Sequence, residues 1–259
     1  MHCISYIGGI MWQRFFVTII LFASLPVNAT TVYDRIAQGL TPNSMTLIGE
    51  SHQRPESIVF FESLITHYLQ QNKCLTVALE ISSGQQSLID EIQKGQATVA
   101  NLKIASPIDH PSLRKLIQDL AEMRINGKCL KLVAVDADFK PGVERDQWIA
   151  KKLIKLSGEA PVLALLGSLH TLKKVDWMYA ELKKEIYAAG ILVSSGYDVK
   201  SYPQVWTERD CNTWIRLIPA DKPEATKLLN SKLIASLNAF EIKKATDAID
   251  GIILWECGE

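Results

Sequence analysis

Short apolar runs alternate with longer amphipathic stretches along most of this chain. The apolar runs predict four core strands, at 44–52 (SMTLIGESH), 75–80 (LTVALE), 130–138 (LKLVAVDAD) and 161–170 (PVLALLGSLH). The stretches between them have a helical period and predict helices at 55–72, 84–95, 111–128 and 144–158. Apolar strands separated by helices of about ten or more residues are typical of a parallel sheet. We therefore predict an α/β fold with a mostly parallel central sheet and helices on both faces.

The pattern is less regular towards the C-terminus. A further helix is predicted around 180–190, followed by a strand at 191–199 (ILVSSGYDV). Later, WIRLIP at 214–219 and GIILWE at 251–256 predict strands, and a helical segment at 221–237 lies between them. These segments either extend the sheet or cover one of its edges, and the pattern does not choose between the two.

The first 29 residues have the layout of a secretory signal peptide. Arg14 precedes an apolar run, which ends in the small-residue site Val27-Asn28-Ala29. That run is shorter than the roughly 20 residues needed to cross a bilayer. We predict cleavage before Thr30, a true start at Met11, and a single domain over residues 30–259. The mature protein is then periplasmic or secreted, with no stable membrane anchor.

The charge balance and the cysteine content indicate which partners and which cross-links to expect. The chain has 28 basic and 28 acidic residues, and this balance argues against nucleic acid as a partner. Four cysteines remain after the predicted cleavage site, an even number that suggests disulfides in an exported protein. Cys74 and Cys129 each precede a predicted strand, so parallel neighbouring strands would bring them together at one edge. We predict this pair and, by remainder, Cys211 with Cys257; a zinc site is the alternative.

Titratable residues stand at the carboxyl end of each predicted core strand. These residues are Glu50, His52, Glu80, Asp136, Asp138 and His170. Ligands of open α/β sheets bind outside the carboxyl ends of the strands, so this edge is the predicted site. Glu50 and His52 are two residues apart and should point to the same side of their strand. A charge inside an apolar strand costs several kcal/mol unless it is paired or solvated.

Structural explanations compete with the functional one. Glu80 could cap a helix, His170 could be a loop histidine, and Asp136 and Asp138 could form a turn. We expect His67 and His110 to be structural, with Asp109 capping the helix that follows His110. The tryptophans at 206, 214 and 255 are expected in the core or in a pocket wall.

Four motifs in order resemble one known superfamily. They are Gly49-Glu50-Ser51-His52, the strand ending in Glu80, Arg145-Asp146 through Ala150, and Gly167 to His170. Together they are similar to the group that contains erythromycin esterases, ChaN-type haem-binding proteins and TIKI/TraB-type proteins. The segment after His52 is Gln53-Arg54-Pro55 where the ChaN branch has Asp-Asn-Pro, a difference that weakens the haem-binding interpretation more than the hydrolytic one.

The resemblance implies a hydrolase that acts on an ester or amide carbonyl of a small-molecule or peptide substrate. We expect His52 to be the general base, oriented by Glu50 or Glu80. His170 would hold the oxyanion or protonate the leaving group, and Arg145 would anchor a substrate carboxylate or neutralise the carboxylates. TIKI-type relatives imply a variant in which Glu50, His52, Glu80 and His170 hold a divalent metal that activates the water. The sequence does not choose between these versions.

The ChaN branch implies the alternative, a haem- or metal-binding protein of iron uptake. Haem capture would need an axial tyrosine or histidine on an exposed face, shared across a homodimer. Tyr179, Tyr197 and Tyr202 are candidates for that ligand, and nothing in the sequence selects among them. An ordinary serine triad has little support, because no G-x-S-x-G elbow is present and Ser51 points away from His52.

Overall fold

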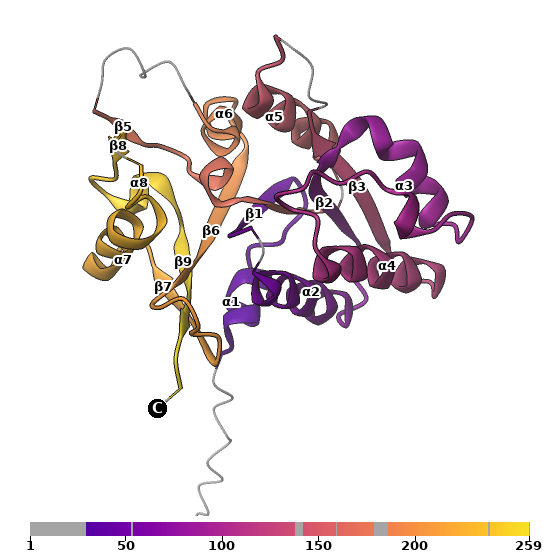
Figure 1. Cartoon of the computed structure of the whole chain (residues 1–259), viewed down its shortest axis with the longest axis horizontal. Helices are drawn as coiled ribbons and strands as arrows, with labels where there is room; N and C mark the ends of the chain where they lie inside the picture. The colour runs from indigo at the N-terminus through magenta and orange to yellow at the C-terminus, as the bar shows by residue number, and fades with distance from the viewer. Residues whose placement is uncertain are drawn as a thin grey trace, which may run out of the picture. The chain divides into compact units, whose positions relative to one another are not determined.

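A mixed sheet of seven strands forms the centre of the fold. In the computed structural model its strands pair in the order β3-β2-β4-β1-β6-β9-β7, and β7 is antiparallel to β9 while the other neighbours are parallel. Their bounds are β1 Ser44–Glu50, β2 Leu75–Ser82, β3 Leu130–Asp136, β4 Val162–Gly167, β6 Asp198–Trp206, β7 Trp214–Pro219 and β9 Gly251–Glu256. The predicted α/β class with a mostly parallel sheet is confirmed (Figure 1).

The structure describes residues 30–52, 54–137, 142–158, 160–178, 186–237 and 239–258. The predicted signal peptide, Asp138 and Tyr179 lie outside these ranges, so what was predicted of them stays a prediction. No helix within these ranges is long and apolar enough to cross a bilayer.

Side chains at alternate positions along the strands pack into two separate hydrophobic cores, one on each face of the sheet. On one face, Ile48, Leu79 and Leu165 are buried with the apolar sides of the helices α1 Val32–Ala37, α2 Pro55–Leu69, α3 Gln86–Ile92 and α4 Pro111–Ile125. On the other face, Leu47 and Ala164 are buried with α5 Arg145–Leu156 and α6 Ala188–Ser194. The strands therefore have apolar side chains on both faces, which is why their sequences read as almost continuous apolar runs.

The C-terminal segments extend the sheet and also cover it. β9 pairs with β6, and β7 completes that edge. Ile252 and Leu254 of β9 are buried against Ala225 of α7 (Pro223–Leu228), Leu229 and Ala248 of α8 (Ala245–Ala248). The predicted helical segment at 221–237 is shorter than expected, because α7 passes into a π-helical turn at Leu229–Leu233. A small antiparallel pair, β5 Asp176–Trp177 with β8 Phe240–Glu241, closes this side.

The strand predicted at 191–199 is wrong. The first part of that segment, residues 191–194, belongs to the helix α6, and the strand is β6, which starts only at Asp198. Ala188, Ala189 and Leu192 are buried at helical spacing, whereas Val193 is 44% exposed. β6 was hard to recognise because its buried positions include Ser201 and Gln204. These two bond to the carbonyl of Thr171 and to the indole of Trp255, so their burial is compensated.

Two disulfides join the four cysteines as predicted. Cys74 bonds to Cys129 and Cys211 bonds to Cys257. The first pair forms because β2 and β3 are parallel neighbours in which Leu75 faces Leu130, so the preceding cysteines meet at the amino edge of the sheet. Disulfides persist mainly in oxidising compartments, which agrees with the predicted export.

The histidines and tryptophans predicted to be structural lie mostly in packed or hydrogen-bonded positions. His67 on α2 pairs with Asp34, at 2.9 Å. His110, not Asp109, caps α4: its Nδ1 accepts a hydrogen bond from the N–H of Leu113, whereas Asp109 is drawn away by Arg114. Among the tryptophans, 206 and 255 are buried and stack on each other, while 214 is 63% exposed and belongs to neither core nor pocket.

Candidate functional site

The strand order places the predicted site residues along one edge of the sheet. β3, β2, β4 and β1 are consecutive neighbours, and they end in or carry Asp136, Glu80, Gly167 and Glu50 respectively. The register pairs Glu50 directly with Gly167. Because all four strands are parallel, these polar groups share the carboxyl edge, where α/β proteins bind ligands.

His52 and Glu50 form a hydrogen-bonded pair at the end of β1. Nδ1 of His52 lies 2.8 Å from Oε1 of Glu50. Glu50 is 5% exposed, whereas the imidazole of His52 is 40% exposed and lines a cavity. The hydrogen bond that Nδ1 of His52 donates to the Glu50 carboxylate raises the pKa of His52 above its usual value. With Nδ1 engaged by the carboxylate, Nε2 is the atom that His52 can offer to a ligand or a water molecule.

Arg145 binds two carboxylates from neighbouring strands. It is the first residue of α5, and its Nε and Nη2 each lie 2.8 Å from an oxygen of Asp136. Nη2 also bonds to Glu80, whose other oxygen accepts the backbone N–H of Gly167. The bonds to Asp136 raise the pKa of Arg145, so the guanidinium stays charged. Of the two roles predicted for Arg145, this geometry favours neutralising the carboxylates.

His170 is held by Asp146, a carboxylate outside the predicted set of site residues. Its Nδ1 lies 2.7 Å from Oδ1 of Asp146, which also accepts the N–H of Ala188 at 2.7 Å. Nε2 of His170 lies 4.0 Å from Oε1 of Glu80. Burial by itself would lower the pKa of His170, but the hydrogen bond to Asp146 and the charges of Asp146 and Glu80 outweigh it, and the pKa is raised.

The four predicted residues converge on Gly167. A methyl group placed on this glycine would lie 3.4 Å from Oε2 of Glu80, 3.4 Å from Cε1 of His52 and 3.6 Å from Cδ2 of His170. Glu50 joins the group through its bond to His52. The absence of a side chain at position 167 therefore leaves the space between the two imidazoles open.

A cavity of about 670 Å³ opens from this cluster. His52, His170 and Arg145 line its polar end, and Leu169, Val205, Trp206, Leu233 and Leu237 contribute apolar walls. The volume is that of a typical small-molecule pocket. Trp206 is thus a pocket wall, as predicted, and it stacks on Trp255 with ring centroids 6.0 Å apart.

The geometry does not gather the four predicted metal ligands into a coordination sphere. Within the described ranges, the group of three donors that lie within 4.8 Å of one another is Glu208, Cys211 and Cys257, and its two cysteines are joined in a disulfide. At the cluster itself Glu80 is already bonded to the cation Arg145, and Glu50 to His52. This donor arrangement does not fit a resident divalent metal.

Two further carboxylates, Asp136 and Asp146, belong to this cluster through their bonds to Arg145 and His170. For Asp136 the sequence allows either a turn or a site role, and the structure pairs it with Arg145. Asp146 was available as the second residue of the Arg-Asp motif, which starts α5 and presents both side chains to the edge of the sheet. An adjacent Arg-Asp at a helix start, following a strand that ends in Asp, was the signal that could have identified both.

Comparisons with known proteins support the fold. No protein-family profile matches the sequence, and no curated protein matches it. ChaN of Campylobacter jejuni, described with cofacially bound haem, superposes with a TM-score of 0.50 and 14% identity over 70% of this chain and 88% of ChaN. A variant of the erythromycin esterase EreC in an open conformation gives 0.55 and 10% identity, over 86% of this chain and 93% of EreC. The predicted resemblance in fold to erythromycin esterase and ChaN is confirmed.

Proposed function

We propose that this protein is an exported hydrolase in which His52 activates a water molecule against an ester or amide carbonyl. The observation that carries the proposal is the pair of carboxylate-bound imidazoles, Glu50–His52 and Asp146–His170, on either side of Gly167 at the polar end of a cavity. The fold shared with the erythromycin esterase EreC supports a hydrolytic reaction of this kind.

The reaction follows from the state of each group. Nε2 of neutral His52 takes a proton from water while the water oxygen bonds to the carbonyl carbon, giving a tetrahedral oxyanion. Glu50 orients the ring and stabilises the imidazolium that forms. His170, whose raised pKa favours the protonated form, faces the same space and stabilises the oxyanion or gives its proton to the leaving oxygen or nitrogen. The carbonyl then reforms, the bond to the leaving group breaks, and a carboxylic acid and an alcohol or amine are released.

Arg145 has a supporting part in this scheme. Glu80 and Asp136 would otherwise be two buried carboxylates side by side, each costing several kcal/mol without a partner. Arg145 bonds to both and offsets part of their negative charge, and the other oxygen of Glu80 accepts the backbone N–H of Gly167. It is a positioning residue, and the metal-free version of the hydrolase is the one that these contacts favour.

The test is hydrolysis of an activated ester such as 4-nitrophenyl acetate. His52→Ala and His170→Ala should each lower kcat/KM by about 10²- to 10⁴-fold, the usual range for general acid–base assistance, while circular dichroism shows a folded protein. His67→Ala is the matched control, because that histidine lies on α2, pairs with Asp34 of α1 and does not line the cavity. Normal hydrolysis by both site variants would overturn the mechanism.

Haem capture is the second candidate, and the fold shared with ChaN is the observation that favours it. Among the predicted axial tyrosines, Tyr202 is 9% exposed, and burial raises its pKa to about 12. His52 is the more accessible ligand at the cavity. Absorbance near 400 nm in the purified protein, or after addition of haem, supports this candidate, and elemental analysis of the same sample tests for a divalent metal.

A further inference from the structure

One wall of the cavity has an excess of positive charge that the hydrolytic scheme does not use. Arg54, Arg209 and Lys232 line it, and the acidic residues that line the same cavity are Glu208 and Glu50, of which Glu50 is bonded to His52. The whole chain is electrically neutral, with 28 basic and 28 acidic residues, so this excess is local. Cations gathered in a concave surface raise the local concentration of anions.

These three cations are not compensated by ion pairs. Within the described part of the chain, no carboxylate lies within 4.0 Å of Arg54, Arg209 or Lys232, whereas Arg114, Arg145 and Arg216 each have acidic partners. The guanidinium of Arg54 donates to the carbonyl of Arg209, and Nζ of Lys232 donates to the carbonyl of Thr207 at 2.6 Å. A guanidinium has five N–H donors and an ammonium three, so each keeps donors for a ligand.

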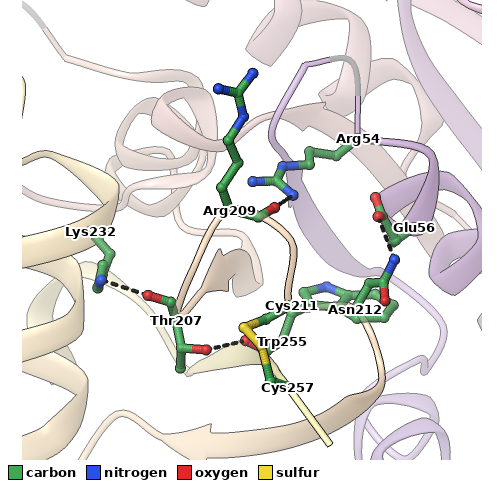
Figure 2. Close-up of a disulfide and its surroundings, with 9 residues drawn as sticks. All are labelled: Arg54, Glu56, Thr207, Arg209, Cys211, Asn212, Lys232, Trp255 and Cys257. Atoms are coloured by element: carbon green, nitrogen blue, oxygen red, sulfur yellow. Dashed lines mark hydrogen bonds between the residues drawn. A yellow bond between two sulfur atoms is a disulfide. The ribbon is translucent and has the colours of Figure 1, made fainter.

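The wall is built from rigidly held parts. Arg54 lies over the ring of Trp206, with Cζ 4.8 Å from the centroid. The loop that carries Arg209 is tied to β9 by the Cys211–Cys257 disulfide and by the N–H of Thr207, which donates to Trp255 at 3.0 Å. Asn212 binds Glu56 of α2 at 3.2 Å. Figure 2 shows the disulfide, the Asn212–Glu56 bond and a further bond from the Thr207 hydroxyl to the carbonyl of Trp255, with the Arg209 side chain extending away from the disulfide. Preorganised donors lose little entropy when a ligand binds.

We infer that the substrate of the proposed hydrolase carries an anionic group, a carboxylate or a phosphate, which binds to Arg54, Arg209 and Lys232. This inference rests on the proposed function for the reaction but not for the binding. Both anions match the fork of an arginine, and Lys232 adds a point charge. The apolar walls formed by Leu233 and Leu237 lie in the same cavity and suit a hydrocarbon segment between the anion and the scissile carbonyl.

Paired esters test the inference. Mono-4-nitrophenyl suberate ends in a carboxylate, and its terminal-amide analogue has almost the same shape without the charge. The wild type should hydrolyse the acid with the higher kcat/KM, and added salt should reduce that advantage. Arg209→Gln and Lys232→Gln should each lower the ratio of the two kcat/KM values by about two- to fivefold, the effect of one partly exposed ion pair. Lys128→Gln, which removes an exposed charge before β3 and outside the cavity, should leave the ratio unchanged.

Binding measurements separate this inference from the proposed function. Calorimetry on wild type and on His52→Ala should show that benzoate and phenyl phosphate bind more tightly than the neutral isostere benzamide. Whichever of benzoate and phenyl phosphate binds more tightly identifies the anionic group of the substrate as a carboxylate or a phosphate. If neither ester is hydrolysed but the anions bind and Arg209→Gln weakens them, the hydrolase fails and the anion site stands. If esters are hydrolysed with no preference for the acid and benzoate binds no better than benzamide, the anion site is wrong and the hydrolase stands.

Discussion

At the scale of single residues, the chemistry depends on which nitrogen of each imidazole is occupied. In both histidines a carboxylate engages Nδ1, through Glu50 for His52 and through Asp146 for His170. The pKa of each is raised, but the two rings differ in exposure, at 40% and 14%. The more accessible ring suits proton abstraction from water, and the more enclosed one suits holding charge beside the substrate.

The pH dependence of hydrolysis tests the Glu50–His52 pair. His52 must be neutral to act as a base, so the acidic limb of the kcat/KM profile should rise with pH through a midpoint above 6.5, the ordinary value for histidine. Because His170 acts in its protonated form, kcat/KM should fall again at higher pH. Glu50→Gln removes the charge that raises this pKa, and the midpoint should move to lower pH. The exposed Glu91→Gln is the control and should leave the midpoint in place. An unchanged midpoint in Glu50→Gln would mean that Glu50 does not set the basicity of His52.

At the scale of elements, the site depends on where strands end and where the next element starts. Gly49 of β1 illustrates how closely they pack: a Cβ there would lie 2.9 Å from the backbone of both Pro203 and Ser168. The start of α5 returns Arg145 and Asp146 to the same edge, and Asp146 also binds the first turn of α6. Each charged group is thus held by a strand end or a helix start, rather than by a free loop.

Folding stability should depend on pH through the His170–Asp146 pair. The pKa of His170 is raised in the folded protein, so its contribution is fully present below about 6.5 and is lost as the pH rises through the raised value. Asp146→Asn should therefore lower the free energy of unfolding more at pH 6 than at pH 9. The bond to Ala188 contributes equally at both pH values. Urea unfolding of the two proteins at each pH measures the difference, and an equal loss at both would contradict the assignment.

At the scale of the whole molecule, the two disulfides differ in their position relative to the cavity. Cys74–Cys129 joins the starts of β2 and β3 at the amino edge, away from the cavity. Cys211–Cys257 holds the loop that follows β6, which supplies Thr207, Glu208 and Arg209 to the cavity wall. The bonds close segments of 55 and 46 residues, so loop entropy alone would give each roughly 4 kcal/mol of stabilisation.

The two disulfides therefore form a matched pair for mutation. Replacing either pair with serine should lower the free energy of unfolding by a similar amount, up to roughly 4 kcal/mol. Loss of Cys211–Cys257 should also raise KM for an anionic ester, because the loop carrying Arg209 is released. Loss of Cys74–Cys129 should leave KM unchanged in the protein that remains folded. Chemical denaturation and steady-state kinetics at 25 °C distinguish these effects, and an equal change of KM in both variants would argue against a role of the loop in binding.

Local patterning was enough for the class of fold, the core strands up to Gly167, the Cys74–Cys129 pairing and the polar edge around Glu50, His52, Glu80 and His170. Strands that are buried on both faces of a parallel sheet have almost continuously apolar sequences, so they can be recognised from sequence. Parallel strands also bring their carboxyl ends to one edge, so the residues at those ends can be predicted to lie together. Tertiary packing decided the rest. β6 has polar residues at buried positions that are satisfied only by distant partners, so its pattern concealed a strand. Asp146 and the cationic wall of Arg54, Arg209 and Lys232 come from segments far apart in sequence, and only folding brings them to one cavity.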